Sequence, residues 1–144
     1  MLFQGEDSSL ELTVAGYELQ DPDGSGDEKN WLVLRCTWHR EDGSVRKDSC
    51  GCIRTYELTA LNAGLKVLRA GLRNRFESEL QEPWFTLQMA ALPGERFSFA
   101  VSFYLPNTMD GEDTAEVEGE MSPEELRGIT EELDRACRKY PDRV

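Results

Sequence analysis

The sequence lacks most of the features that mark secreted, membrane-spanning or metal-stapled proteins. No run of about 18 apolar residues could span a bilayer, and the start has no basic stretch followed by the apolar run of a secretory signal. Its four cysteines are scattered: Cys36, Cys50, Cys52 and Cys137. A chain of 144 residues buries roughly two thirds of its surface in one core without a disulfide or a metal. We therefore expect a cytoplasmic protein with reduced thiols.

Motifs for catalysis and for metal or cofactor binding are also missing. His39 is the only histidine, and the chain has no glycine-rich phosphate loop and no nucleophile elbow. Cys50 and Cys52 form one C-x-C pair, but the second pair of a zinc site is absent. The acidic stretch 21–27 lacks the spacing and the final glutamate of a calcium loop. These absences predict a protein that is not an enzyme and holds no metal or cofactor.

Basic residues are absent from two long stretches. The chain has 28 acids and 16 bases, for a net charge of −12. Residues 1–28 hold eight acids and no base, and residues 106–126 hold eight more acids and again no base. Such blocks repel nucleic acid and anionic lipid and attract cationic partners. The competing interpretation is that they only keep the protein soluble.

The centre of the predicted fold is the stretch Asn30–Arg40, NWLVLRCTWHR. Because side chains alternate across a strand, one of its faces is continuously apolar. The residues of that face are Leu32, Leu34, Cys36 and Trp38. We expect Trp38 in the main core, and Trp31, on the opposite face, only partly covered.

The spacing of apolar residues predicts the remaining elements. Further strands are expected at 9–14 (continuing over 17–19 after a bulge), 45–53, 76–81, 84–91, 96–104 and 114–121. One helix should follow, with Thr55 or Thr59 as the cap of its start, Gly71 as its C-terminal stop and a close contact at Gly64. A second should begin at Ser122, whose spacing to Pro123 and Glu125 forms a capping box, and end at Tyr140-Pro141.

These elements predict an α+β fold with the order βββαββββα. It consists of one largely antiparallel, curved sheet of about six to seven strands packed with two helices. We assign residues 9–144 to this single domain and residues 1–8 to an N-terminal tail. Leu2-Phe3-Gln4-Gly5 matches the core of a rhinovirus 3C protease site, so residues 1–5 have two open origins, a native start and the remnant of a tag.

Several short patterns, taken in order, resemble the WapI family of bacterial immunity proteins. They are Tyr17, the D-x-x-N-W-L stretch from Asp27 to Leu32, Glu57-Leu58, Glu82-Pro83 before Phe85-x-Leu87, and the closing Leu133, Tyr140, Pro141 and Arg143. The resemblance extends from about Ser9 to Arg143. It implies a cytosolic antidote to a contact-delivered toxin, often a nuclease.

Two functions are therefore compared. In the first, the chain is an immunity protein that neutralises a toxin domain by occluding its basic active-site surface. The expected partner is a basic protein rather than nucleic acid or membrane. The expected partner-binding residues are Asp110, Glu112, Asp113, Glu116, Glu118 and Glu120, with Asp21, Asp23 and Asp27 as a second patch. In the second, the chain is a non-enzymatic adaptor or structural interaction module whose acidic loops are incidental.

Overall fold

The computed structural model describes residues 1–19, 26–108 and 111–143. Its elements, in chain order, are β1 (Leu2–Gln4), β2 (Ser9–Tyr17), the 3-10 helix η1 (Gly26–Asn30), β3 (Trp31–His39), β4 (Val45–Arg54), α1 (Thr55–Arg69), β5 (Arg75–Glu77), β6 (Phe85–Leu92), β7 (Arg96–Thr108), β8 (Gly111–Met121) and α2 (Pro123–Lys139).

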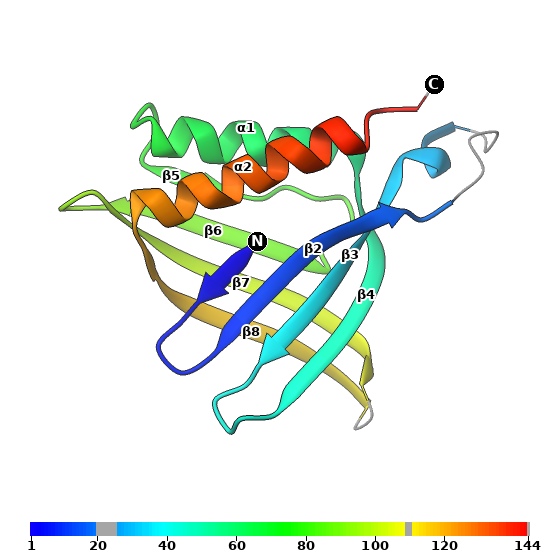
Figure 1. The fold of residues 1–144 in the computed structure, drawn as a ribbon, viewed down its shortest axis with the longest axis horizontal. Coiled ribbons are helices and arrows are strands. Elements are labelled where there is room, and N and C mark those ends of the chain that lie inside the picture. Colours follow the sequence, from blue (N-terminus) through cyan, green and yellow to red (C-terminus); the bar gives the residue numbers. More distant parts are fainter. Residues whose placement is uncertain (20–25, 109–110, 144) are drawn as a thin grey trace.

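The strands form two antiparallel sheets, in the orders β1-β2-β3-β4 and β5-β6-β7-β8 (Figure 1). The predicted α+β class with two helices is confirmed, but the structure has eight strands in two sheets where we expected six to seven in one. The additional strand is β1, which has only three residues and is too short to show a period. In the chain, α1 separates the two sheets, with β1–β4 before it and β5–β8 after it.

The two sheets approach each other along two pairs of strands, β1 with β8 and β4 with β7. We call the first contact the β1–β8 seam and the second the β4–β7 seam. At the β1–β8 seam, a Cβ on Gly5 would lie 2.8 Å from the carbonyl oxygen of Glu118, so glycine is required for this approach. At the β4–β7 seam, the backbone N–H of Asn107 donates a 2.9 Å hydrogen bond to Asp48.

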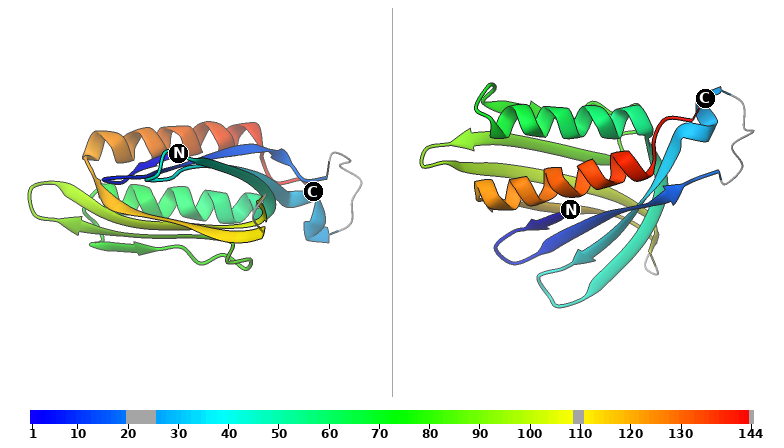
Figure 2. Two further views of the ribbon diagram at one scale, coloured as in Figure 1. Left: turned by 90° about the horizontal axis from the view of Figure 1, so that it is seen from below. Right: turned by 45° about the horizontal axis from the view of Figure 1, so that its top comes forward.

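The helices lie side by side and cover the same side of the two sheets (Figures 1 and 2). They are joined through Asp134 of α2, which accepts hydrogen bonds from Asn62 at 2.7 Å and Lys66 at 2.6 Å. The hydrogen bond from Lys66, followed by that from Asn62, lowers the pKa of Asp134 below its ordinary value. In the part of the chain described here, no helix is long and apolar enough to cross a membrane.

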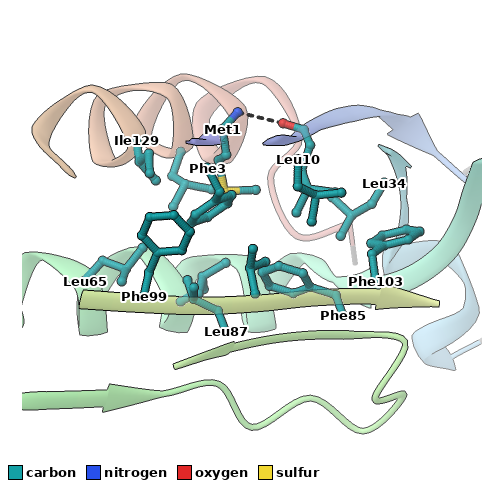
Figure 3. Close-up of a cluster of buried hydrophobic side chains, with 14 of the residues drawn as sticks. Met1, Phe3, Leu10, Leu34, Leu65, Phe85, Leu87, Phe99, Phe103 and Ile129 are labelled. Carbon is teal, nitrogen blue, oxygen red and sulfur yellow. Dashed lines mark hydrogen bonds between the residues drawn. The ribbon is translucent and has the colours of Figure 1, made fainter. Parts of the chain in front are cut away.

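The core lies between the sheets and under the helices. Figure 3 shows side chains of β6 and β7 facing residues of β2 and β3, with one leucine of α1 and one isoleucine of α2 completing the cluster. The labelled examples are Phe85, Leu87, Phe99, Phe103, Leu10, Leu34, Leu65 and Ile129. Leu32, Leu34 and Cys36 are fully buried, as the alternation of β3 predicts.

Both tryptophans of β3 are only half-buried. Trp38 packs against the core as expected, but at its edge, so it is less buried than a central core position would require. Trp31 lies on the opposite face of the strand and is not among the residues that pack against the core. The difference for Trp38 arises because it is near the end of β3, beside the turn to β4.

Residues 1–8 differ from the tail that we expected. Phe3 on β1 is 0% exposed, and its ring centroid is 5.6 Å from that of Phe99. Met1 is also buried, and its backbone nitrogen donates a 2.6 Å hydrogen bond to the carbonyl of Leu12 (Figure 3). The first residues therefore fill part of the core.

Local signals set the ends of both helices. Gly71, at a φ of +78°, donates to the carbonyl of Leu68, and Leu72 donates to that of Val67, which is the Schellman arrangement. At the start of α2, Ser122 accepts a 3.1 Å hydrogen bond from the N–H of Glu125, and the Glu125 carboxylate accepts one from the N–H of Ser122. The predicted capping box is confirmed.

The residues after α2 fasten it to distant parts of the chain. The Tyr17 hydroxyl donates to the carbonyl of Pro141 at 2.6 Å, and the Arg143 guanidinium lies 3.7 Å from the centroid of the Tyr17 ring. Asn30 exchanges two hydrogen bonds with the backbone of Arg143, of 3.2 and 2.7 Å. Arg143 also donates to the carbonyl of Leu19. This C-terminal strap therefore holds the end of β2 and the start of β3 together.

Candidate functional site

Five of the nine expected partner-binding residues lie on β8. They are Glu112, Asp113, Glu116, Glu118 and Glu120. Asp21, Asp23 and Asp110 lie outside the described residues. Asp27 is part of the backbone of η1, but its side chain is not described.

The glutamates of β8 project outward because the strand alternates. Ala115 and Val117 are buried, whereas Glu116, Glu118 and Glu120 are exposed. Successive glutamates on one face of a strand are two residues apart, or about 7 Å. The strand therefore presents a row of three carboxylates on its outer face.

The carboxylates of β8 differ in what they contact. Glu112 accepts a 2.5 Å hydrogen bond from the Tyr104 hydroxyl, and this bond raises the pKa of Tyr104. Asp113 accepts a 2.8 Å bond from the N–H of Thr114, and Glu120 lies 3.5 Å from Arg96. Glu116 and Glu118 form no ion pair with any residue that the structure describes. These two are the carboxylates of the row that remain available to a cationic partner.

Glu116 and Glu118 line a cleft of about 470 Å³ at the β1–β8 seam. Three further carboxylates join them there. Glu6 and Asp7 come from the turn between β1 and β2, and Glu41 comes from the turn between β3 and β4. We call these five side chains, with Trp38 and Arg40, the acidic cleft.

Trp38 and Arg40 contribute a different chemistry to the acidic cleft. The Arg40 guanidinium lies 5.1 Å from the centroid of the Trp38 ring. Arg40 is the only base among the described residues that line the cleft, so the five carboxylates outnumber the cations. The ring nitrogen of Trp38 is buried and has no hydrogen-bond partner within the described chain. Tryptophan is one of the residue types enriched at the energetic centres of protein interfaces.

The acidic cleft depends on residues that sequence reasoning did not select. Glu6 and Asp7 belong to the first acidic block, but no local pattern predicts that the turn carrying them lies beside β8. Glu41 is not among the residues that the sequence predicts to bind a partner. Trp38 was assigned to the core. The close approach at Gly5 that brings the turn to β8 requires the tertiary structure.

The arrangement is suited to binding positive charge. Within residues 1–19, 26–108 and 111–143, no group of three or more His, Cys, Asp or Glu side chains could hold a metal ion. His39 is exposed at the end of β3 and does not line the cleft. A surface of this kind attracts and orients a cationic partner.

The comparison with protein families gives one match. The model of the immunity protein WapI-like family matches residues 1–141. No curated protein and no solved structure matches the chain.

Proposed function

This chain belongs to the immunity protein WapI-like family, and on that premise we propose that it binds a cognate bacterial toxin and neutralises it. The toxin is a contact-delivered protein, and the encounter takes place in the cytoplasm of the cell that carries this chain. The protein acts by binding alone, without catalysis of its own.

The observation that carries this proposal is the acidic cleft at the β1–β8 seam. A nuclease toxin must present basic groups where it holds phosphates, because nucleic-acid affinity comes from cations that face the backbone. Glu41 offers a carboxylate to those cations from a turn, and Glu116 and Glu118 offer theirs from a strand. A carboxylate row seated on a basic active site occupies the place of the substrate phosphates.

Trp38 gives the same surface a site of close packing. Tryptophan is the residue type most enriched among those that dominate binding energy, and it acts best when polar neighbours exclude water around it. Trp38 is half-buried and is surrounded by the carboxylates of the acidic cleft. We therefore place it at the centre of the interface and the glutamates around it.

The test is protection against the toxin encoded beside this gene. The toxin domain is produced from an inducible promoter in a sensitive strain, alone or with this protein, and growth and nucleic-acid integrity are followed. We expect wild type to restore growth and Glu41→Gln/Glu116→Gln/Glu118→Gln to protect less well.

The matched control removes the same charge elsewhere. Glu11, Glu124 and Glu131 are exposed on β2 and α2 and do not line the acidic cleft. Their triple replacement with Gln should protect as wild type does. If wild type itself leaves the toxin active while remaining folded, the chain is an adaptor or structural module and the proposal fails.

A further inference from the structure

A second cleft opens at the β4–β7 seam, away from the acidic cleft. It has a volume of about 560 Å³, within the range of about 300–1,000 Å³ that is usual for small-ligand sites. Its lining includes Trp31 at the start of β3, Trp84 just before β6, and Cys50 of β4. Glu18 and Glu82 complete it. We call these residues the tryptophan cleft.

The charge of the tryptophan cleft has one sign. Glu18 and Glu82 both line it, and none of its described lining residues is Lys, Arg or His. In the described chain, neither glutamate has an ion-pair partner. Gly51 allows the Glu18 side chain to lie against β4, because a Cβ at this position would overlap the Glu18 carboxylate. A side chain that enters here therefore meets two carboxylates that form no ion pair with any residue the structure describes.

Both tryptophan rings are held by neighbours. The Arg54 guanidinium lies 4.8 Å from the centroid of the Trp31 ring, and Arg54 also pairs with Glu57 at 3.4 Å. The Trp84 ring meets the Tyr104 ring edge to face, with centroids 5.2 Å apart. Rings that are fixed before binding lose little conformational freedom when a ligand stacks on them.

We propose that the tryptophan cleft receives the guanidinium group of an arginine side chain from a partner protein. A planar guanidinium stacks on indole and pairs with a carboxylate through two parallel hydrogen bonds, whereas an ammonium is a point charge. The paired indoles and carboxylates of the tryptophan cleft match both properties. The assignment of that arginine to the toxin rests on the proposed function, but the recognition of arginine by the cleft does not.

The test uses the full-length protein and a small probe, acetyl-arginine-amide. Binding is followed by the NMR signals of the three indole N–H groups. We expect the signals of Trp31 and Trp84 to move with a millimolar dissociation constant. Acetyl-citrulline-amide, which has nearly the same shape but no charge, should leave all three signals unchanged.

Two charge-matched variants locate the binding. Glu18→Gln/Glu82→Gln should raise the dissociation constant at least about tenfold, since both charged partners of the guanidinium are lost. Glu11→Gln/Glu124→Gln removes the same charge from β2 and α2 and should leave the constant unchanged. Equal responses to the arginine and citrulline probes, equal effects of the two variants, or no movement of the Trp31 and Trp84 signals would each overturn the proposal. If the wild-type protein binds the arginine probe but does not protect cells from the toxin, only the proposed function is contradicted.

Discussion

Gly64 lies in the middle of α1, where the ring of Phe76 packs against the helix. A Cβ at this position would overlap Cε2 and Cδ2 of that ring. Alanine would gain about 1 kcal/mol of helix propensity, but overpacking at such a contact costs about 1–3 kcal/mol. Because the Cβ would lie no more than 2.7 Å from each of these ring atoms, the cost should be in the upper part of that range. We therefore expect Gly64→Ala to lower the free energy of unfolding by about 1–2 kcal/mol in urea denaturation.

Gly128 of α2 provides the matched comparison. It is exposed, and a Cβ there would meet nothing within 4 Å. Gly128→Ala should therefore raise the free energy of unfolding by about 0.5–1 kcal/mol through propensity alone. If the two substitutions shift the denaturation midpoint in the same direction, the contact of Phe76 with Gly64 does not constrain the helix.

Cys36 should make stability sensitive to alkaline pH. Burial, followed by the charges of Asp48 and Cys50, raises the pKa of its thiol from 9.0 to about 12. The unfolded chain loses this proton near pH 9 while the folded chain keeps it, so ionisation favours the unfolded state. The contribution of Cys36 is therefore complete below pH 9 and is lost as the pH rises toward about 12.

The loss can be measured against a variant that lacks the thiol. By about pH 10 the free energy of unfolding of wild type should fall by about 1.4 kcal/mol more than that of Cys36→Ala. Equal pH dependence of the two proteins between neutral pH and about pH 10 would contradict the raised pKa. Urea denaturation under reducing conditions measures the free energy of unfolding of both proteins at each pH.

The sequence predicted that Gly64 has a close neighbour but did not identify it. A glycine in the middle of an otherwise regular leucine stripe indicates a contact, because nothing local explains its cost. Phe76, which makes the contact, belongs to β5, a strand of three residues. A strand of three residues has a single inward side chain, so its sequence shows no period from which the contact with Gly64 could be predicted.

At the scale of elements, the start of α2 rests on the Ser122 capping box. Ser122→Ala removes the acceptor of the Glu125 N–H, and N-cap losses of this kind cost about 1 kcal/mol. We expect this decrease in the free energy of unfolding, with toxin binding unchanged because Ser122 does not line the acidic cleft. No measurable decrease would mean that the serine does not set the helix start.

The start of α1 depends on a buried carboxylate instead. Glu57 accepts hydrogen bonds from the N–H of Arg54 and the N–H of Gln81, both at 2.9 Å. In Glu57→Gln one oxygen becomes an NH₂ group, so one of these donors faces another donor. Leaving a buried group unsatisfied costs about 1–3 kcal/mol, and we expect a loss of that size in thermal and urea unfolding.

Glu125→Gln is the control for Glu57→Gln. Glu125 is exposed, and glutamine serves at the same position of a capping box. The same chemical change should therefore cost much less in α2 than in α1. A similar cost at both positions would show that the hydrogen bond to Gln81 contributes little.

Long elements with a regular period were predictable from the sequence. Short elements and the way the strands assemble into sheets were not. The strands of residues 96–104 and 114–121 and both helices have many repeats of one period, and the structure contains them. β1 and η1 have too few residues to show a period, and the division into two sheets depends on which strand edges meet. The helix of residues 55–69 was predictable, but its N-cap is Arg54 and neither Thr55 nor Thr59, and the role of Glu57 there depends on Gln81, 24 residues away.

For the whole molecule, the proposed function predicts an electrostatic effect on the rate of toxin binding. Glu116→Gln/Glu118→Gln should slow association with the toxin several-fold at low salt and leave dissociation nearly unchanged, because rim charges steer the encounter. The difference from wild type should shrink between about 0.01 and about 0.15 M ionic strength, as the Debye length falls from about 30 to about 8 Å.

Stopped-flow association at the two ionic strengths measures this effect. Glu11→Gln/Glu124→Gln carries the same net charge and should behave as wild type if the position of the charge matters. Equal slowing by both double variants would mean that only the net charge of −12 steers the toxin. The acidic cleft would then be only a hydrated surface.

The family could be predicted from the sequence, whereas the acidic cleft could not. The resemblance to the WapI family used short patterns in a fixed order, and the family match confirms it. The acidic cleft combines carboxylates of two turns and a strand that are separated by up to about a hundred residues. Charge blocks along the sequence show that acids are abundant, but they do not show which of them share a surface.

The C-terminal strap has a consequence for how the protein is made. Arg143 and Pro141 contact Tyr17 and Asn30, which precede them by more than a hundred residues. A ribosome extends a chain by about 5–20 residues per second, and contacts between distant residues form slowly. The end of β2 and the start of β3 therefore lack these contacts until all the helices and strands have been translated. We therefore expect the fold to be completed only after residue 143 has left the ribosome, and on the proposed function the protein protects its cell only from that moment on.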